Sequence, residues 1–159
     1  MIQEMTTTTA DLYDELGDDI QSLPIQFRLF GARPKFEGLI RTVKCFEDNA
    51  VLKSVLSTPG NGGVLVVDGG GSLERALMGD MIAQIAADNG WAGVVINGAI
   101  RDRVAIANIS IGVKALGTNP RKSTKTGEGK TDIVLAFGGV TFRPGAKLFS
   151  DEDGVLVEY

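Results

Sequence analysis

A helix followed at once by a short buried strand is the feature of this sequence that most limits its fold. Residues 79–102 read GDMIAQIAADNGWAGVVINGAIRD. Residues 81–89 place their apolar side chains on one face of a helix, and the Asn-Gly pair at its end is a typical stop. Residues 93–96 are apolar and β-branched, as in a buried strand, and Asn97-Gly98 predicts a turn after it. A helix and a strand in this order indicate an α/β layer.

Three charged residues stand at the two ends of this unit. The helix start and the far end of the strand can lie side by side, which would bring Asp80, Arg101 and Asp102 together. The first N–H groups of a helix attract anions, and Arg101 can bind a carboxylate through two parallel hydrogen bonds. Asp102 is a hard oxygen ligand suited to Mg²⁺ or Mn²⁺, and Asp80 could orient or deprotonate a water. Such a site suits a small 2-oxo acid chelated to a metal.

The same three residues also have an interpretation without chemistry. Asp80 could serve only as a helix cap, which is the commonest role of aspartate at a helix start. Arg101 and Asp102 could lie in a solvated turn. The pattern alone leaves both interpretations open.

The absence of histidine excludes several classes of site. The chain has no histidine and one cysteine, Cys45. Catalytic triads of the Ser-His-Asp type, Cys-His pairs and zinc sites built from histidine or clustered cysteine are therefore excluded. A metal in this protein must be bound by oxygen, which favours Mg²⁺ or Mn²⁺. A disulfide framework within the chain is excluded too, and we expect Cys45 to be a packed thiol in a reducing cytoplasm.

The length and charge of the chain indicate one acidic domain. Its 159 residues fit a single domain over 1–159, long enough for a core. The net charge of -4 argues against nucleic acid as a direct partner. No stretch is long enough to cross a membrane, and the acidic N-terminus MIQEMTTTTADLYDEL lacks the form of a signal peptide. We expect a cytoplasmic protein without a membrane partner.

Short strands and a few helices account for the rest of the sequence. A helix is predicted over 11–16, capped by Thr9 or Asp11, and another runs from a cap at Asp48 to Ser57. Residues 105–108 fit one turn of helix. Strands are predicted over 40–46, 64–67, 113–116, 133–137, 140–142 and 155–157, with a strand and loops over 24–38 and turns between the last two strands. Together these elements indicate an α/β class with a layered or barrel-like sheet.

Two loops invite functional interpretations. Gly69-Gly70-Gly71 begins like a dinucleotide-binding turn, but the third glycine of that motif would fall at Glu74, so a close approach of backbone to another surface or to a ligand is the better interpretation. Residues 119–130 carry a cluster of basic residues. This cluster could be a solvated loop, an anion-attracting rim of the pocket or a contact for an acidic protein; its members are Arg121, Lys122, Lys125 and Lys130.

The spacing of the charged residues matches a known signature. Asp80, then twenty residues, then Arg101-Asp102 resembles the D-X20-R-D signature of metal-dependent pyruvate aldolases that cleave 4-hydroxy-4-methyl-2-oxoglutarate. The wider chain resembles the RraA branch of the same superfamily, named for regulators of ribonuclease E activity. The resemblance covers nearly the whole chain. It is carried by FEDNAVLKSVL (46–56), GGVLVVDGGGSLERALMGD (62–80), GWAGVVINGAIRD (90–102), IGVKALGTNPRKSTKTGEG (111–129) and FGGVTFRPGAKLFSDEDGVLV (137–157).

The resemblance implies a fold and a reaction. It implies a swivelling β/β/α-type layered domain that assembles as a ring-shaped homotrimer or a multiple of three, with sites at subunit junctions. It implies class II aldol cleavage to pyruvate, with decarboxylation of oxaloacetate as a side activity and no Schiff-base lysine. The implied ligand of the divalent metal is Asp102, Asp80 positions a water, and the substrate is bound by Gly79, Asp80, Met81, Ile82 and Arg101.

Two departures separate this chain from its relatives and keep a second function open. The aldolases often carry an acidic residue three positions after the metal-binding aspartate, where this chain has Ala105. The RraA regulators often lack the aspartate at position 102, which this chain has. The enzyme is therefore the favoured hypothesis. The alternative is a non-catalytic regulator that binds a ribonuclease of the E type and inhibits it.

Overall fold

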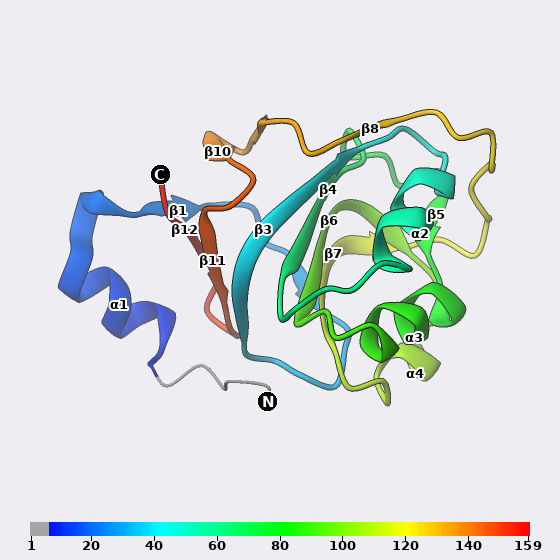
Figure 1. The fold of residues 1–159 in the computed structure, drawn as a ribbon. Coiled ribbons are helices and arrows are strands. Elements are labelled where there is room, and N and C mark those ends of the chain that lie inside the picture. Colours follow the sequence, from blue (N-terminus) through cyan, green and yellow to red (C-terminus); the bar gives the residue numbers. More distant parts are fainter. Residues whose placement is uncertain (1–6) are drawn as a thin grey trace.

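Parallel strands form the centre of the molecule. The computed structural model describes residues 7–159, and its longest sheet has the order β1-β12-β11-β3-β4-β6-β7-β2, with β5 beside β6 and β8 beside β3 (Figure 1). The neighbours within the central group run parallel. Its members are β3 (Phe36–Lys44), β4 (Val64–Asp68), β6 (Gly93–Ile100) and β7 (Gly112–Thr118). Parallel neighbours need crossover connections, and the helices supply them.

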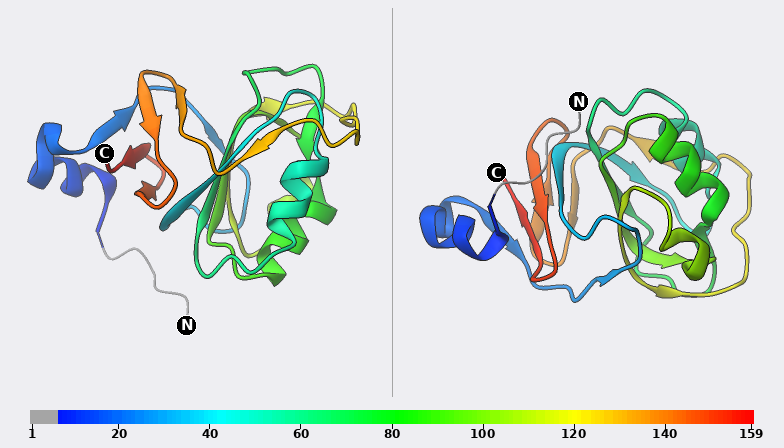
Figure 2. Two further views of the ribbon diagram at one scale, coloured as in Figure 1. Left: turned by 45° about the horizontal axis from the view of Figure 1, so that its top comes forward. Right: turned by 90° about the horizontal axis from the view of Figure 1, so that it is seen from below.

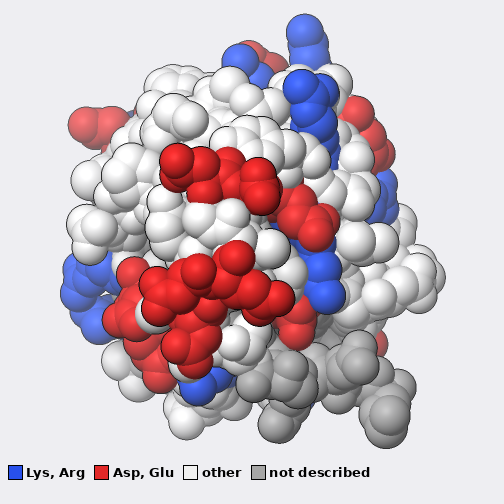
Figure 3. Space-filling view, turned by 90° about the vertical axis from the view of Figure 1, so that its left-hand side faces the viewer, with Lys and Arg blue, Asp and Glu red and all other residues white. Residues whose placement is uncertain are grey.

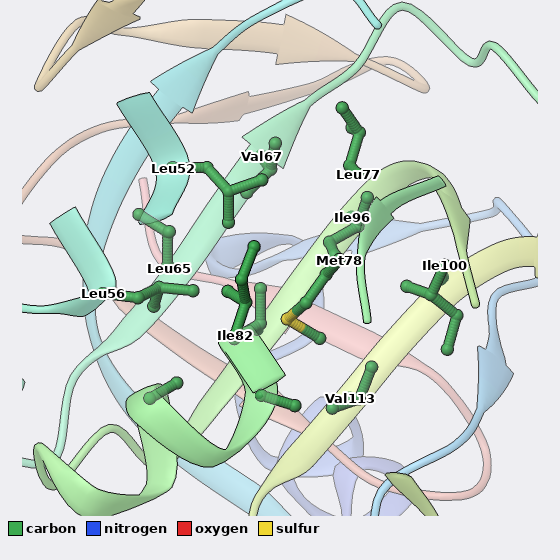
Figure 4. Packing of buried hydrophobic residues seen from close by; sticks show 14 of the residues in the cluster. Leu52, Leu56, Leu65, Val67, Leu77, Met78, Ile82, Ile96, Ile100 and Val113 are labelled. Atoms are coloured by element: carbon green, nitrogen blue, oxygen red, sulfur yellow. The ribbon is translucent and has the colours of Figure 1, made fainter. Parts of the chain in front are cut away.

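Helices cover one face of this sheet, as the views in Figure 2 show. They are α2 (Ala50–Leu56), α3 (Asp80–Asp88) and α4 (Arg103–Ile106). Figure 4 shows Leu52, Leu56 and Ile82 from these helices against Leu65 and Ile96 of the strands. Each of these side chains is at most 8% exposed. Burial of such a leucine or isoleucine contributes about 1.5–3 kcal/mol, so this contact fixes the start of α3 against the sheet.

Antiparallel strands cover the other face. A second core contains Phe36, Val64, Val66 and Val95 from the parallel strands together with Phe142 and other side chains from the C-terminal third. The strands of this layer are β1 (Gln21–Leu23), β9 (Leu135–Phe137), β10 (Val140–Phe142), β11 (Lys147–Ser150) and β12 (Val155–Val157). The result is a mixed α/β fold with a large central sheet and a few flanking helices.

The remaining elements are short. Helix α1 (Thr9–Leu16) and the 3-10 turn η1 (Gly17–Asp19) lie beside β12 on the outer side of the antiparallel layer (Figure 1). Strand β2 (Arg28–Leu29) closes the other edge of the sheet against β7. Two further strands, β5 (Ala76–Met78) and β8 (Lys130–Thr131), flank the parallel strands.

The predicted turn at Asn97-Gly98 is wrong. Strand β6 continues through both residues to Ile100, and its pairing with β7 shifts register between Ile96 and Ala99. The strand remains extended because the Asn97 carbonyl accepts hydrogen bonds from the Gly69 and Gly71 amides, at 3.0 and 3.1 Å. The glycine-rich loop thus brings its backbone close to another segment, as the sequence predicted. An Asn-Gly pair marked a bulge in a buried strand here, not a hairpin.

Several other boundaries differ from the prediction. The first helix begins at Thr9 and is capped by the Thr8 hydroxyl, which accepts from the Asp11 amide at 3.0 Å; Thr9 and Asp11 are not the cap. The cap position of α2 is Asn49, not Asp48. The segment before β12 was predicted as turns, but it contains strand β11. The alternating burial of this strand was not recognised because turn residues surround it.

Burial explains the apolar C-terminus and the single cysteine. Val155, Leu156 and Val157 are buried in the chain itself, between β1 and β11, so their apolar character needs no partner subunit. Cys45 is buried, as predicted. Burial raises the pKa of its thiol to about 12, and the nearby Asp48 and Asp68 contribute less to the same shift. Residues 1–6 of the N-terminal segment lie outside the described residues. Within 7–159, no helix has the length and apolar character needed to span a membrane.

Candidate functional site

The structure brings the three predicted charged residues together. Strand β5 leads through Gly79 into α3, and the neighbouring strand β6 leads through Arg101 into α4. The Arg101 amide donates to the Met78 carbonyl at 2.9 Å, which joins the two strand ends. The Asp80 amide donates to Asp102 Oδ2 at 3.1 Å. The sequence predicted this neighbourhood correctly because adjacent parallel strands end at the same edge of a sheet.

Asp102 occupies the cap position of α4 in an unusual backbone conformation. Its φ of 60° and ψ of 39° lie in the left-handed region, and its carbonyl accepts the first hydrogen bond of that helix from Ile106 at 2.9 Å. This conformation is uncommon for a residue with a side chain, and such residues concentrate at functional sites. It directs the Asp102 carboxylate back toward α3 rather than along its own helix.

The arginine beside it is held but accessible. Arg101 Nε lies 4.0 Å from Asp102 Oδ2, and Arg101 Nη1 donates to the Pro120 carbonyl at 3.4 Å. The Arg101 and Asp102 side chains are 42% and 40% exposed. A pair this exposed adds little to stability. The guanidinium therefore keeps donors available for a ligand.

Gly79 leaves room for the carboxylate. A Cβ atom built on Gly79 would lie 2.5 Å from Asp102 Oδ2 and 3.4 Å from Arg101 Nε. The φ of Gly79 is −117°, so the backbone there would accept any residue. A side chain at this position would therefore displace the Asp102 carboxylate, although the backbone would accept it.

The start of α3 presents backbone donors. The first hydrogen bond of the helix runs from the Ala83 amide to the Gly79 carbonyl at 3.1 Å, so the amides of Met81 and Ile82 precede it. The Asp80 amide is used by Asp102. The Ile82 side chain is buried and the Met81 side chain is 70% exposed, so the predicted contribution of Ile82 to binding is limited to its backbone.

A cavity of about 140 Å³ is lined by these groups and by a basic wall. That wall contains Lys53 of α2 and Asn49 at the cap position of this helix, together with Lys122 and Lys125 from residues 119–130. The basic loop therefore faces the pocket, in agreement with the rim interpretation. The sequence analysis missed Asn49 and Lys53, because neither stands in a motif with Arg101 and only the folded chain brings α2 to this edge.

The carboxylate oxygens at the cavity suit a hard divalent cation. They are too few to surround it with protein ligands alone. Its acidic residues are Asp80 and Asp102. Across the described part of the chain, there is no group of three or more His, Cys, Asp or Glu side chains that could hold a metal. Mg²⁺ is commonly bound through one or two carboxylates, with waters and substrate completing its octahedron. The free space of the cavity and the Asp102 carboxylate at its wall are compatible with that arrangement.

A shallow groove adjoins the cavity between α3 and α4. It measures about 670 Å³ and includes Ala105, which stands where related aldolases often have an acidic residue. Met81 at its edge is exposed, and so is Val104 on α4, at 80%. No acidic side chain of α4 replaces the missing one, since this helix reads RVAI.

The one strongly buried lysine in the described chain does not line the cavity. Lys114 of β7 is 3% exposed, and its ammonium donates to the carbonyls of Asp151 and Gly154 in the antiparallel layer. Burial lowers the pKa of Lys114 to about 8, although the nearby carboxylate of Asp151 opposes this shift. A Schiff-base role at the cavity would require a different lysine.

Comparison with known proteins identifies the class. The model of the RraA-like family, described as Aldolase/RraA, matches residues 9–157. The chain therefore belongs to the Aldolase/RraA family.

Solved structures agree with this assignment. A protein described as S-adenosylmethionine:2-dimethylmenaquinone methyltransferase from Geobacillus kaustophilus HTA426 is 49% identical, with a TM-score of 0.94 over 96% of this chain and 94% of that one. The RNA-processing inhibitor RraA from Thermus thermophilis is 46% identical, with a TM-score of 0.93 over 97% and 93% of the two chains. Streptomyces coelicolor RraAS2, of the RNase ES inhibitor family, is 28% identical, with a TM-score of 0.77 over 95% and 79%.

Proposed function

We propose that this protein is a divalent-metal-dependent aldolase that cleaves 4-hydroxy-4-methyl-2-oxoglutarate to two molecules of pyruvate and also decarboxylates oxaloacetate. The observation that carries the proposal is the convergence of Asp80, Arg101 and Asp102 with the open start of α3 on one cavity. The family contains both lyases and ribonuclease inhibitors, and only the former need this constellation.

The substrate carboxylate next to the 2-oxo group would bind between Arg101 and α3. Arg101 offers a planar pair of donors, and the amides of Met81 and Ile82 add two more at the positive end of the helix dipole. The far carboxylate of the substrate would face the basic wall that includes Lys53 and Lys125. A dicarboxylic 2-oxo acid matches this distribution of charge.

Asp80 would handle the proton. Cleavage of the C3–C4 bond removes the proton of the 4-hydroxyl, forms the carbonyl of one pyruvate and leaves the enolate of the other. A water held by Asp80 would accept the hydroxyl proton, and a proton returned to the methylene carbon of the enolate gives the second pyruvate. The Asp80 side chain is exposed at the cavity, where it can hold a water beside that carbon. The same enolate forms when oxaloacetate loses CO₂, so one arrangement serves both reactions.

A metal bound by Asp102 completes the proposed site. Mg²⁺ or Mn²⁺ held there would supply Lewis-acid polarisation of the 2-oxo group. Asp102 is suited to this role because its left-handed backbone presents the carboxylate to the cavity, and Gly79 leaves space beside it. No described acidic residue of α4 adds a second ligand, so substrate oxygens and water would fill the remaining positions.

We further propose that the working form is a cytoplasmic homotrimer, or a multiple of three, of swivelling β/β/α-type domains. The resemblance to the aldolases supports this proposal, since their sites lie where subunits meet. The exposed Met81 also supports it, because this residue lines a groove that a neighbouring subunit could cover, and Val104 is exposed next to Ala105 of the same groove.

The first prediction tests the carboxylate clamp. Pyruvate release from 4-hydroxy-4-methyl-2-oxoglutarate and from oxaloacetate is measured with and without Mg²⁺, for the parent, Arg101→Lys and Arg101→Ala. Loss of a hydrogen bond to a charged group costs about 1.5–3 kcal/mol, or roughly a ten- to hundredfold loss of kcat/KM. We expect Arg101→Lys to be impaired and Arg101→Ala nearly inactive, both with the parent's melting temperature. An Arg101→Ala protein as active as the parent would refute the clamp.

The second prediction concerns Asp102. Asp102→Asn preserves shape but removes the charge that binds the metal, so Mn²⁺ affinity, measured by titration calorimetry, and cleavage should fall together by about tenfold or more. Asp132→Asn is the matched control, since Asp132 pairs with Arg41 away from the cavity. Full Mg²⁺-dependent activity in Asp102→Asn would show that another residue binds the metal.

A second candidate function is inhibition of a ribonuclease of the E type. The 46% identity to the Thermus RNA-processing inhibitor favours it, as does the acidic face around α1 in Figure 3, which could receive a basic segment of a partner. The acidic side chains of α1 and η1 are Asp11, Asp14, Glu15, Asp18 and Asp19. A pull-down with the three proteins of the first experiment separates the functions: under the regulator hypothesis Arg101→Ala binds the ribonuclease as the parent does, and none of the three releases pyruvate.

A further inference from the structure

A buried carboxylate outside the cavity organises its basic wall. Asp48 lies between β3 and α2 and is fully buried. Its Oδ2 accepts from the Thr124 hydroxyl at 2.8 Å, the Thr126 hydroxyl at 2.7 Å and the Thr126 amide at 2.6 Å. Its Oδ1 accepts from the amides of Ala50 and Gly127, at 3.2 and 3.3 Å. Three of these five donors are amides, which can only donate, so the contacts favour an ionised carboxylate. These hydrogen bonds, the strongest from Thr126 and Thr124, outweigh burial and lower its pKa.

The residues that donate to Asp48 lie beside two lysines of the cavity. Thr124 and Thr126 flank Lys125, and Ala50 begins α2, the helix that carries Lys53. Both lysines line the cavity, although Asp48 itself does not. Asp48 therefore connects the two segments that form the basic wall of the cavity.

The other end of the same loop is held independently. The Ser123 hydroxyl donates to the Ala76 carbonyl at 2.7 Å, and the Ala76 amide donates to the Arg121 carbonyl at 2.7 Å. Lys122 is thus fixed through β5, without Asp48.

On one side of Lys125, Thr124 also has backbone hydrogen bonds with Glu47 and Asn49, at 2.9 and 3.1 Å. On the other side, Thr126 and Gly127 donate to the Asp48 carboxylate, so Lys125 depends on Asp48 mainly through Thr126. Loss of the Asp48 carboxylate should displace Lys125 more than Lys122.

We propose that Asp48 is a positioning residue that holds Lys125 at the cavity, where the lysine binds the carboxylate of the substrate farthest from Arg101. This inference rests on the proposed function for the identity of the substrate. It adds a residue that touches neither substrate nor metal and acts only through Lys125. A purely structural Asp48 would lower stability without changing the affinity for the second carboxylate.

The experiment compares Asp48→Asn, Lys125→Met, the double variant and a matched control. In Asp48→Asn, the new amide NH₂ would face donors, so the loop should release Lys125. We expect KM for oxaloacetate to rise about tenfold or more in either single variant, with a smaller change in kcat. The double variant should be no worse than Lys125→Met alone, because both changes remove one interaction.

Asp151→Asn is the control. Asp151 is also buried and accepts several hydrogen bonds, from the Thr9 amide at 2.8 Å, the Thr9 hydroxyl at 2.6 Å and the Asp153 amide at 3.0 Å. It lies in the antiparallel layer, away from the cavity. Its loss should lower the melting temperature and leave KM unchanged. Thr126→Val is included because it removes one donor to Asp48 and keeps the carboxylate; if Asp48→Asn does not fold, a rise in KM in Thr126→Val carries the test.

A binding measurement separates this proposal from the aldolase proposal. Malonate and acetate are titrated against each protein, and the Met81 and Ile82 amide resonances report binding. Malonate affinity should fall in Asp48→Asn and Lys125→Met but not in Asp151→Asn. Acetate affinity should be the same in these three variants and in the parent. If this pattern of affinities appears but no protein releases pyruvate, the aldolase proposal is refuted and the positioning role of Asp48 stands. Unchanged malonate affinity in Asp48→Asn, effects that multiply in the double variant, or no malonate binding by the parent would overturn the inference.

Discussion

Gly79 shows how a residue without a side chain can define a charged site. The Asp102 carboxylate reaches the first amide of α3 across the space where a Cβ would stand. The sequence predicted Gly79 only as part of a binding segment implied by resemblance. That its role is to make space for Asp102 follows from the backbone approach of two strand ends, which no local pattern encodes.

The third prediction follows from this contact. Gly79→Ala should fold with nearly the parent's melting temperature, because a φ of −117° suits alanine. The new methyl group, 2.5 Å from Asp102 Oδ2, should displace the carboxylate and Arg101. Misplacement by about 1 Å can cost on the order of a hundredfold in rate, so kcat/KM should fall by roughly that factor. Gly117→Ala is the control, since its Cβ would meet only Leu73 at 3.7 Å; equal activity of the two variants would contradict the role of Gly79.

The charged residues and the basic wall differ in how far sequence could predict them. Asp80, Arg101 and Asp102 lie at the ends of consecutive elements, so their spacing carries their proximity. Lys125 reaches the cavity because Asp48, from 77 positions earlier in the chain, binds the residues on both sides of it. A basic loop without such a contact has the same composition, and for this reason the sequence left three interpretations open.

At the scale of elements, buried polar contacts connect the layers. Lys114 extends from β7 into the turn between β11 and β12, where its ammonium donates to the carbonyls of Asp151 and Gly154. The Asp151 carboxylate then accepts from Thr9 at the start of α1. One buried lysine thus joins the parallel strands, the C-terminal hairpin and the first helix.

The fourth prediction uses the pKa of Lys114. In the folded chain this pKa is about 8, below its ordinary value of 10.5. Between these two values the unfolded chain binds more protons, so the lysine's contribution to the free energy of unfolding rises with pH. Relative to Lys114→Met, the parent should gain up to about 3 kcal/mol between pH 7.5 and 10.5, as measured by urea unfolding. The buried Cys45 thiol is common to both proteins and cancels.

An exposed lysine supplies the control for this measurement. Lys35→Met removes a solvated charge from the surface and should run parallel to the parent over the same pH range. If Lys114→Met also runs parallel to the parent, Lys114 keeps its proton throughout, and its burial is compensated by the two carbonyls.

Elements were predictable where periodicity and burial agreed. The predicted helix over 81–89 appears as α3 at Asp80–Asp88, and the strand at 64–67 appears as β4. Strand β6 was cut short in the prediction because Asn-Gly is a strong turn signal, and the contact that keeps it extended comes from residues 69–71. Such errors arise where a distant segment decides the backbone of a local one.

At the scale of the whole molecule, two cores on opposite faces of one sheet account for the apolar residues at the C-terminus. The helical core and the antiparallel core share the strands β4 and β6 between them. This arrangement leaves the cavity at the edge of the sheet, with the exposed Met81 of α3 in its lining, and Val104 of α4 is exposed as well. The case for assembly therefore depends on this edge, and not on Val155, Leu156 and Val157, which the chain buries itself.

The fifth prediction is a solution mass near three times the 16.8 kDa chain, or a multiple of three, by light scattering at micromolar concentration. If α3 and α4 form the contact, Val104→Asp should shift the mass toward the monomer, because burying an unpaired carboxylate at an interface is costly. Tyr159→Asn replaces an exposed apolar side chain near α1 instead, and should leave the mass unchanged. Activity should fall with the mass in Val104→Asp, since a site at a subunit junction is incomplete in the monomer. A monomeric parent that is fully active would refute the trimer and would place the whole site within one chain.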